Sequence, residues 1–242
     1  MTPRSRLFAC STLAVALGFV VAPRAVSADL SKDAAKAAVA ADVATLEKQL
    51  AELSTTQKKN LAVGARGIAL LLMNYGDEAT KAQAVKVYAG LKLKEKDYKG
   101  GIEAVKALAS PPAGGKFDAK AVEGTFELHD VMHPFSMSKS GGLNIEKDIR
   151  DLSKAGVKVD AKDAIVLGAR VAAIADYTLK LPNEKAMTNA AMKTKWERWS
   201  KDMGTAGVGL TEAAAKNDAK AMTTALKKMG DSCSNCHNDF RD

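Results

Sequence analysis

Long apolar runs, arginine-rich runs and aromatic clusters are all scarce in this sequence of 242 residues. After the first 28 residues, no apolar run approaches the roughly 20 residues that a membrane-spanning helix needs. Aromatic residues make up 5% of the chain, and the basic residues behind its net charge of +8 are interspersed with acids. Nucleic-acid binding therefore has no support. We expect a globular protein without a membrane span in its mature form.

The first 28 residues predict a secretory signal peptide. Arg4 and Arg6 precede an apolar run at 7–22, and Val26-Ser27-Ala28 forms a small-residue cleavage site. An uncleaved membrane anchor is the alternative, but the run is short for one. We expect cleavage after Ala28 and export to the periplasm, or otherwise out of the cytoplasm.

The mature sequence predicts an all-α fold. It has few β-branched or aromatic runs, and apolar residues recur at steps of three and four almost throughout. A Pro- and Gly-rich segment at 110–115 is the best linker candidate. It predicts two consecutive helical bundles, at 29–110 and 118–242. The helices expected in the second are 118–133, 144–154, 161–181, 184–204 and 211–240.

The two predicted bundles contain three pairs of similar sequence segments. TLEKQLAEL (45–53) parallels NIEKDIRDL (144–152), LAVGAR (61–66) parallels IVLGAR (165–170), and DYKGGIEAVKALASPP (97–112) parallels DAKAMTTALKKMGDSC (218–233). The offsets of 99, 104 and 121 rise along the chain, as expected for a duplication with longer loops in the second copy. Chance similarity between Ala- and Lys-rich helices is the alternative. In this alignment Cys233 falls opposite Pro112, so the 29–110 bundle is a degenerate repeat without the cysteines.

The C-terminal segment contains a cofactor-attachment motif. Of the three cysteines, Cys10 lies in the predicted signal peptide, which leaves Cys233 and Cys236 with His237 directly after them. Cys-x-x-Cys-His is the pattern of covalent haem attachment. The two thiols can each form a thioether with one haem vinyl group, and His237 then faces the iron. We therefore expect one covalent haem c here and a haem-free bundle at 29–110.

The spacing of the last helix supports this interpretation. Its apolar residues follow one another at steps of three and four, which places both cysteines on one face: Met222, Leu226, Met229, Cys233, Cys236 and Phe240. A zinc site would need two further Cys or His ligands, and a thioredoxin-like motif would need a βαβ unit. A plain disulfide would explain neither His237 nor the apolar face.

The ending from Cys233 to Arg241, on the last expected helix, resembles the class II cytochromes c, the cytochrome c′ family. The resemblance covers about residues 118–242 and implies a four-helix bundle. It implies that Cys233 and Cys236 hold the haem, that His237 is an axial iron ligand and that Phe240 packs beside it. Class II bundles often pair, so a homodimer is a candidate assembly.

In that family, a residue of the first bundle helix covers the other side of the iron. Here this helix contains His129, Met132 and His133, followed by Pro134. Met132 is the first candidate for a sixth ligand, His133 the second and His129 the third. Pro134 is expected to break the helix. A copper site at His129, His133 and Met137 is a further alternative, while Trp196, Trp199 and Met203 either flank the haem or form ordinary core.

These residues favour one-electron transfer with a redox protein partner. The alternative is a five-coordinate haem that binds a small gas such as nitric oxide, for sensing or scavenging. A third interpretation is that the haem-free half docks the redox partner. The sequence contains no recognisable catalytic group for hydrolysis or group transfer, so we do not expect an enzyme.

Overall fold

The computed structural model describes residues 26–112, 114–118 and 124–240. Most of the predicted signal peptide therefore lies outside the described residues. Regular structure in the described ranges is helical, apart from an isolated bridge between Lys92 and Asp97. This confirms the all-α prediction. None of the helices in these ranges is both long and apolar enough to cross a membrane.

The first half of the chain forms helices α1 (Lys32–Thr56), α2 (Lys59–Tyr75), α3 (Glu78–Gly90) and α4 (Lys99–Val105). The start of α1 is set by Ser31, whose side chain accepts a hydrogen bond from the Ala34 N–H, and Asp77 caps α3 in the same way through Thr80. Gln57 adopts the left-handed conformation that ends α1. Ser31 and Asp77 therefore fix the starts of α1 and α3, and Gln57 fixes the end of α1.

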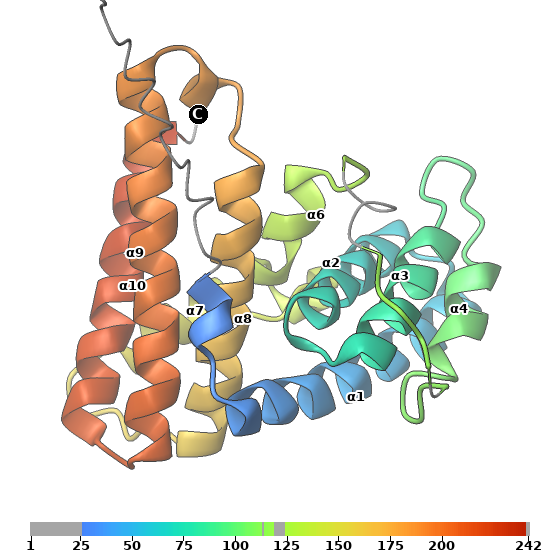
Figure 1. Cartoon of the computed structure of the whole chain (residues 1–242), viewed down its shortest axis with the longest axis horizontal. Helices are drawn as coiled ribbons and strands as arrows, with labels where there is room; N and C mark the ends of the chain where they lie inside the picture. The colour runs from blue at the N-terminus through green and yellow to red at the C-terminus, as the bar shows by residue number, and fades with distance from the viewer. Residues whose placement is uncertain (1–25, 113, 119–123, 241–242) are drawn as a thin grey trace, which may run out of the picture.

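The second half forms α6 (Leu128–Met132), α7 (Ile145–Leu152), α8 (Ala161–Lys180), α9 (Ala190–Ala215) and α10 (Ala219–Phe240). The long helices α8, α9 and α10 stand side by side (Figure 1), with α9 in contact with both of the others. Asp160 and Asn189 cap the starts of α8 and α9. Three-residue 3₁₀ turns follow α6 at His133–Phe135 and precede α9 at Lys185–Met187.

Three sequence-based helix boundaries are wrong. Within the described residues, the helix expected at 118–133 forms only at Leu128–Met132, and residues 119–123 lie outside these ranges. The helix expected from 184 begins at Ala190, after a 3₁₀ turn at Lys185–Met187. The break expected between 204 and 211 does not exist, because α9 continues to Ala215 and the chain turns at Asn217 with φ of 53°. Gly207 of α9 serves the close packing of two helices instead of a turn. A Cβ on Gly207 would lie 2.7 Å from the Gly168 oxygen of α8.

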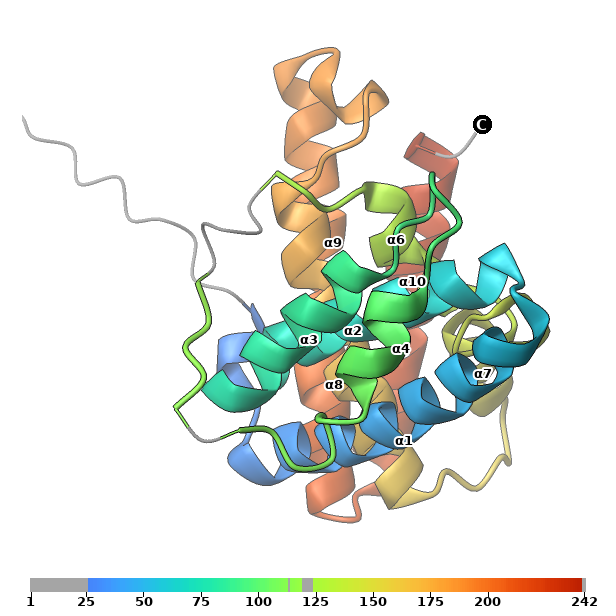
Figure 2. The ribbon, with the colours of Figure 1, turned by 90° about the vertical axis from the view of Figure 1, so that its right-hand side faces the viewer.

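The two halves share one hydrophobic core. Leu50 of α1, Ile68 of α2, Ile174 of α8 and Leu226 of α10 belong to the same cluster of buried side chains. Figure 2 shows the first-half helices in front of α8 and α10, and α1 and α2 both contact α8. The first half therefore forms a wall against the second.

Candidate haem site

Helix α10 presents both cysteines on its apolar face, as the spacing predicts. Met222, Leu226, Met229 and Phe240 are buried on this face, and Cys233 packs against the main core. Cys236 packs against a smaller cluster formed by Ala186, Trp196 and Phe240. Both cysteines are half-buried free thiols, so each has a sulfur available for covalent attachment.

A cavity of about 220 Å³ lies beside these thiols. Cys233, Cys236 and His237 line it from α10, and α9 contributes Trp196, Trp199 and Met203. Met132 and Phe135 line it from the segment that contains α6. The attachment motif thus faces an aromatic and thioether surface.

The thiols sit in surroundings that suit a neutral group. Burial raises the pKa of Cys233 and of Cys236 to about 11, so both free thiols are protonated and neutral at neutral pH. A tetrahedral zinc site would need further ligands, and the described residues contain no group of three or more His, Cys, Asp or Glu side chains placed to hold a metal ion. A thioether is also neutral, so the apolar cavity accommodates it. The donor set and its surroundings fit haem c.

Hydrogen bonds fix the two tryptophans that line the cavity. The Trp196 Nε1 donates to the Thr178 carbonyl at 2.6 Å, and the Trp199 Nε1 donates to Asp239 Oδ2 at 2.9 Å. Phe240 meets the Trp196 ring edge-on, with the centroids 5.1 Å apart. Phe240 therefore supports the cavity wall through Trp196.

The three candidate sixth ligands occupy different environments. Met132 lines the cavity, whereas the His133 Nε2 donates to the Ser140 carbonyl at 2.9 Å. Burial lowers the pKa of His133. The His129 side chain is 68% exposed, and its Nδ1 lies 3.8 Å from Asp130 Oδ1. Of these three residues, the structure brings Met132 to the cysteines.

Of the residues in the copper alternative, His129 and His133 have ring centroids 5.7 Å apart, and Met137 is 47% exposed. The sequence analysis did not single out Phe135, which also lines the cavity. Its position three residues after Met132 is the signal that could have identified it.

A helical protein with Cys-x-x-Cys-His on its last helix, facing an apolar cavity, has the features of a helical c-type cytochrome. The family model of cytochrome c′ matches residues 147–241. The predicted resemblance is therefore confirmed for the C-terminal part of the chain, and it implies a covalently bound haem c there. The match starts after Met132, so it does not include the segment at 128–135 that contains the candidate sixth ligands. No curated protein and no solved structure matches the chain.

Proposed function

We propose that this protein is an exported cytochrome with a single haem c that exchanges one electron at a time with a redox protein partner. One observation carries the proposal: Cys233, Cys236, His237 and Met132 line the same cavity. Haem c, when bound there, supplies a one-electron iron couple. The proposal includes no enzymatic turnover.

Each side chain has a distinct task in this proposal. The sulfurs of Cys233 and Cys236 hold the haem covalently, so it stays attached even when an iron ligand is lost. His237 and Met132 would bind the iron of a haem held there. A thioether ligand raises the reduction potential relative to a second imidazole. Trp196 and Trp199 exclude water, which also tunes the potential.

The gas-binding alternative differs in one feature, an iron position left open to small ligands. An optical spectrum of the reduced mature protein, recorded with and without carbon monoxide, separates the two. The six-coordinate proposal expects a low-spin spectrum and slow carbon monoxide binding, because Met132 must leave first. Rapid binding by the unaltered protein contradicts it and favours the five-coordinate alternative.

The same measurement on variants identifies the ligand. Met132→Ala is expected to lose the low-spin signal, whereas His129→Ala and His133→Ala keep it. Loss of the signal in a histidine variant alone would assign the sixth position to that histidine. Export is tested separately by fractionating cells and determining the N-terminus of the mature protein, which we expect to be Asp29.

A further inference from the structure

The segment that carries Met132 is too short to hold itself in place. Helix α6 has five residues, and a 3₁₀ turn of three residues follows it. A single helical turn is unstable by itself, because nucleation fixes several backbone angles for one hydrogen bond. The position of Met132 therefore depends on what packs against α6.

Helix α2 of the first half packs directly against the backbone of this segment. A Cβ on Gly67 would lie 2.9 Å from the Asp130 oxygen and 3.0 Å from the Pro134 ring. A Cβ on Gly64, one turn earlier, would lie 1.9 Å from the Gly141 oxygen. The segment at 128–135 and the turn at Gly141 that follows it therefore both touch α2 at glycines, where α2 has no side chains.

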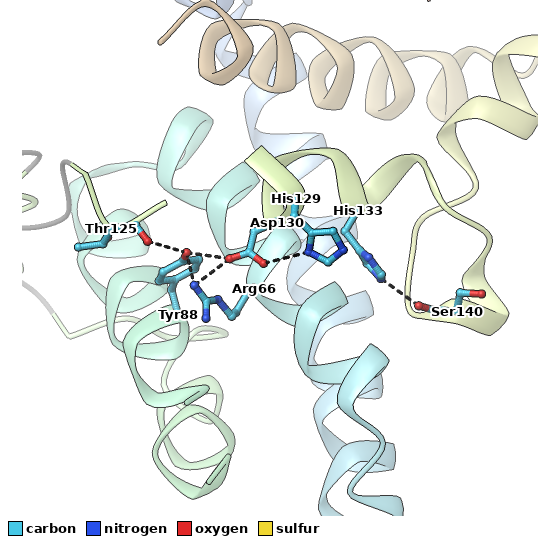
Figure 3. A network of polar contacts seen from close by, with 7 residues as sticks. All are labelled: Arg66, Tyr88, Thr125, His129, Asp130, His133 and Ser140. Atoms are coloured by element: carbon cyan, nitrogen blue, oxygen red, sulfur yellow. Dashed lines mark hydrogen bonds and ion pairs between the residues drawn. The ribbon is translucent and has the colours of Figure 1, made fainter. Parts of the chain in front are cut away.

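A buried charge pair joins the same two elements (Figure 3). The Arg66 Nη2 of α2 lies 2.8 Å from Asp130 Oδ2 of α6, and the two side chains are 14% and 1% exposed. The Tyr88 hydroxyl donates to the same carboxylate oxygen at 2.9 Å. Burial raises the pKa of Tyr88, so this hydroxyl keeps its proton. The Arg66 guanidinium also lies 4.1 Å from the centre of the Tyr88 ring.

The register of α6 connects this pair to the cavity. Asp130 and Met132 are two residues apart, which on an α-helix places them on roughly opposite sides. Asp130 faces α2 and α3, and Met132 lines the haem cavity. Fixing Asp130 therefore fixes the direction of Met132.

From these contacts we infer that Arg66, Tyr88 and Asp130 are positioning residues that hold Met132 over the haem cavity. The haem-free half thus acts as the support of the distal side. The inference rests on the proposed function, since it places a haem in that cavity. It assigns a role to the first half without requiring that half to dock a partner.

The chain contains a matched control for this interaction. Arg170 of α8 pairs with Asp42 of α1 at 2.6 Å, and these side chains are 14% and 0% exposed. The Tyr75 hydroxyl donates to Asp42 as Tyr88 does to Asp130. The two clusters have similar chemistry and burial, but the hydrogen bonds and ion pair of Asp42 join α1 to α2 and α8, and none of them involves a residue of α6.

The experiment uses the full-length mature holoprotein with Arg66→Ala, Arg66→Lys and Arg170→Ala. Hydrogen exchange of the amides at 128–135 reports whether the segment is held, and the rate of carbon monoxide binding reports the position of Met132. We expect Arg66→Ala to lose protection at 128–135 and to bind carbon monoxide at least about tenfold faster, because the state with Met132 away from the iron becomes more populated. Arg170→Ala should bind carbon monoxide as slowly as the unaltered protein and should lose less protection at 128–135 than Arg66→Ala, and Arg66→Lys should recover part of the slow binding.

Two results would overturn the inference. One is equal loss of protection at 128–135 in Arg66→Ala and Arg170→Ala, which would indicate a general loss of stability. The other is loss of protection in Arg66→Ala alone without a change in carbon monoxide binding. Failure of the proposed function looks different, since Met132→Ala would then leave the spectrum of the protein unchanged. In that case the hydrogen exchange at 128–135, compared between Arg66→Ala and Arg170→Ala, still tests whether Arg66 holds this segment in place.

Discussion

Arg170 of α8 donates two hydrogen bonds to Asp42 of α1, from Nε at 2.8 Å and from Nη2 at 2.6 Å. Arg66 of α2 pairs in turn with Asp130 of α6. Each arginine therefore crosses to an aspartate of the other half of the chain. Both arginines end a Gly-Ala-Arg sequence, in the LAVGAR and IVLGAR segments that suggested a duplication. The reciprocal pairing gives these similar segments the same structural task.

The first prediction concerns the stability of the Arg170–Asp42 pair. Arg170→Ala leaves a fully buried carboxylate without its cation, which typically costs about 3–5 kcal/mol. Urea unfolding of the mature protein at neutral pH measures this loss. Asp42→Asn in the Arg170→Ala background should recover part of it, because it removes the unpaired charge. A double variant no more stable than Arg170→Ala contradicts this account.

Acidification should reduce the loss of unfolding free energy that Arg170→Ala causes. Burial raises the pKa of Asp42, and Arg170 opposes this shift. Without Arg170, the folded variant binds a proton more readily than its unfolded chain does. Protonation thus stabilises the folded variant at low pH, and this stabilisation is lost as the pH rises through the folded pKa. The difference in unfolding free energy from the unaltered protein should be smaller near pH 4 than at pH 7.

A second prediction concerns the covalent attachment. Cys233→Ser combined with Cys236→Ser removes both sulfurs that line the cavity. We expect the purified protein to carry no haem that survives denaturing electrophoresis, whereas either single variant keeps one thioether. Covalent haem in the double variant would contradict the assignment of these two residues.

A third prediction separates two glycines of α9. A Cβ on Gly207 would lie 2.7 Å from the Gly168 oxygen and 2.9 Å from the Ala172 nitrogen, both backbone atoms of α8. A Cβ on Gly209 would meet nothing within 4 Å. Gly207→Ala should therefore destabilise the protein by about 1–3 kcal/mol. Gly209→Ala should stabilise it by up to about 1 kcal/mol, because alanine favours the helix. Thermal unfolding measures both, and equal effects would contradict the close packing of α8 on α9.

The sequence predicted those parts of the fold whose signals are local. Apolar periodicity located α8, expected at 161–181 and found at Ala161–Lys180, and in the structure Asp160 caps its start. Pro134 correctly predicted the break after α6. The break expected between 204 and 211 was wrong in a segment that contains Gly204, Gly207 and Gly209, and glycine serves either a turn or the close approach of two helices. Only the position of α8 distinguishes these two uses at Gly207.

In the candidate site, too, the residues related by local spacing could be predicted and those held by distant parts of the chain could not. Cys233, Cys236 and His237 lie within one helical turn, so their shared face follows from spacing. The location of Met132 in the cavity depends on α2, and no local pattern contains that information. The pairing of Arg170 with Asp42 could not be predicted from the sequence either, since 128 positions separate the two residues. The only sequence feature that the two long-range ion pairs share is the repeated Gly-Ala-Arg segment that ends at each arginine.

The last prediction concerns the aspartate that holds Trp199. Lys195 donates to Asp239 Oδ1 at 2.8 Å, and the Trp199 Nε1 donates to Oδ2. These hydrogen bonds, that of Lys195 first, lower the pKa of Asp239. Because the folded pKa lies below the unfolded value of about 3.9, the stabilisation is present above about pH 4 and is lost as the pH falls through the folded pKa. Asp239→Asn lacks this pH-dependent contribution.

We therefore expect the unaltered protein to have a higher midpoint of thermal unfolding than Asp239→Asn at neutral pH. The gap should shrink once the pH falls below about 4. Asp231→Asn is the control, because Asp231 is an exposed acid of the same helix, and its midpoint should follow that of the unaltered protein throughout. A gap for Asp239→Asn that persists unchanged in acid would mean that the ionised carboxylate does not hold Trp199, and that another contact orients this wall of the cavity.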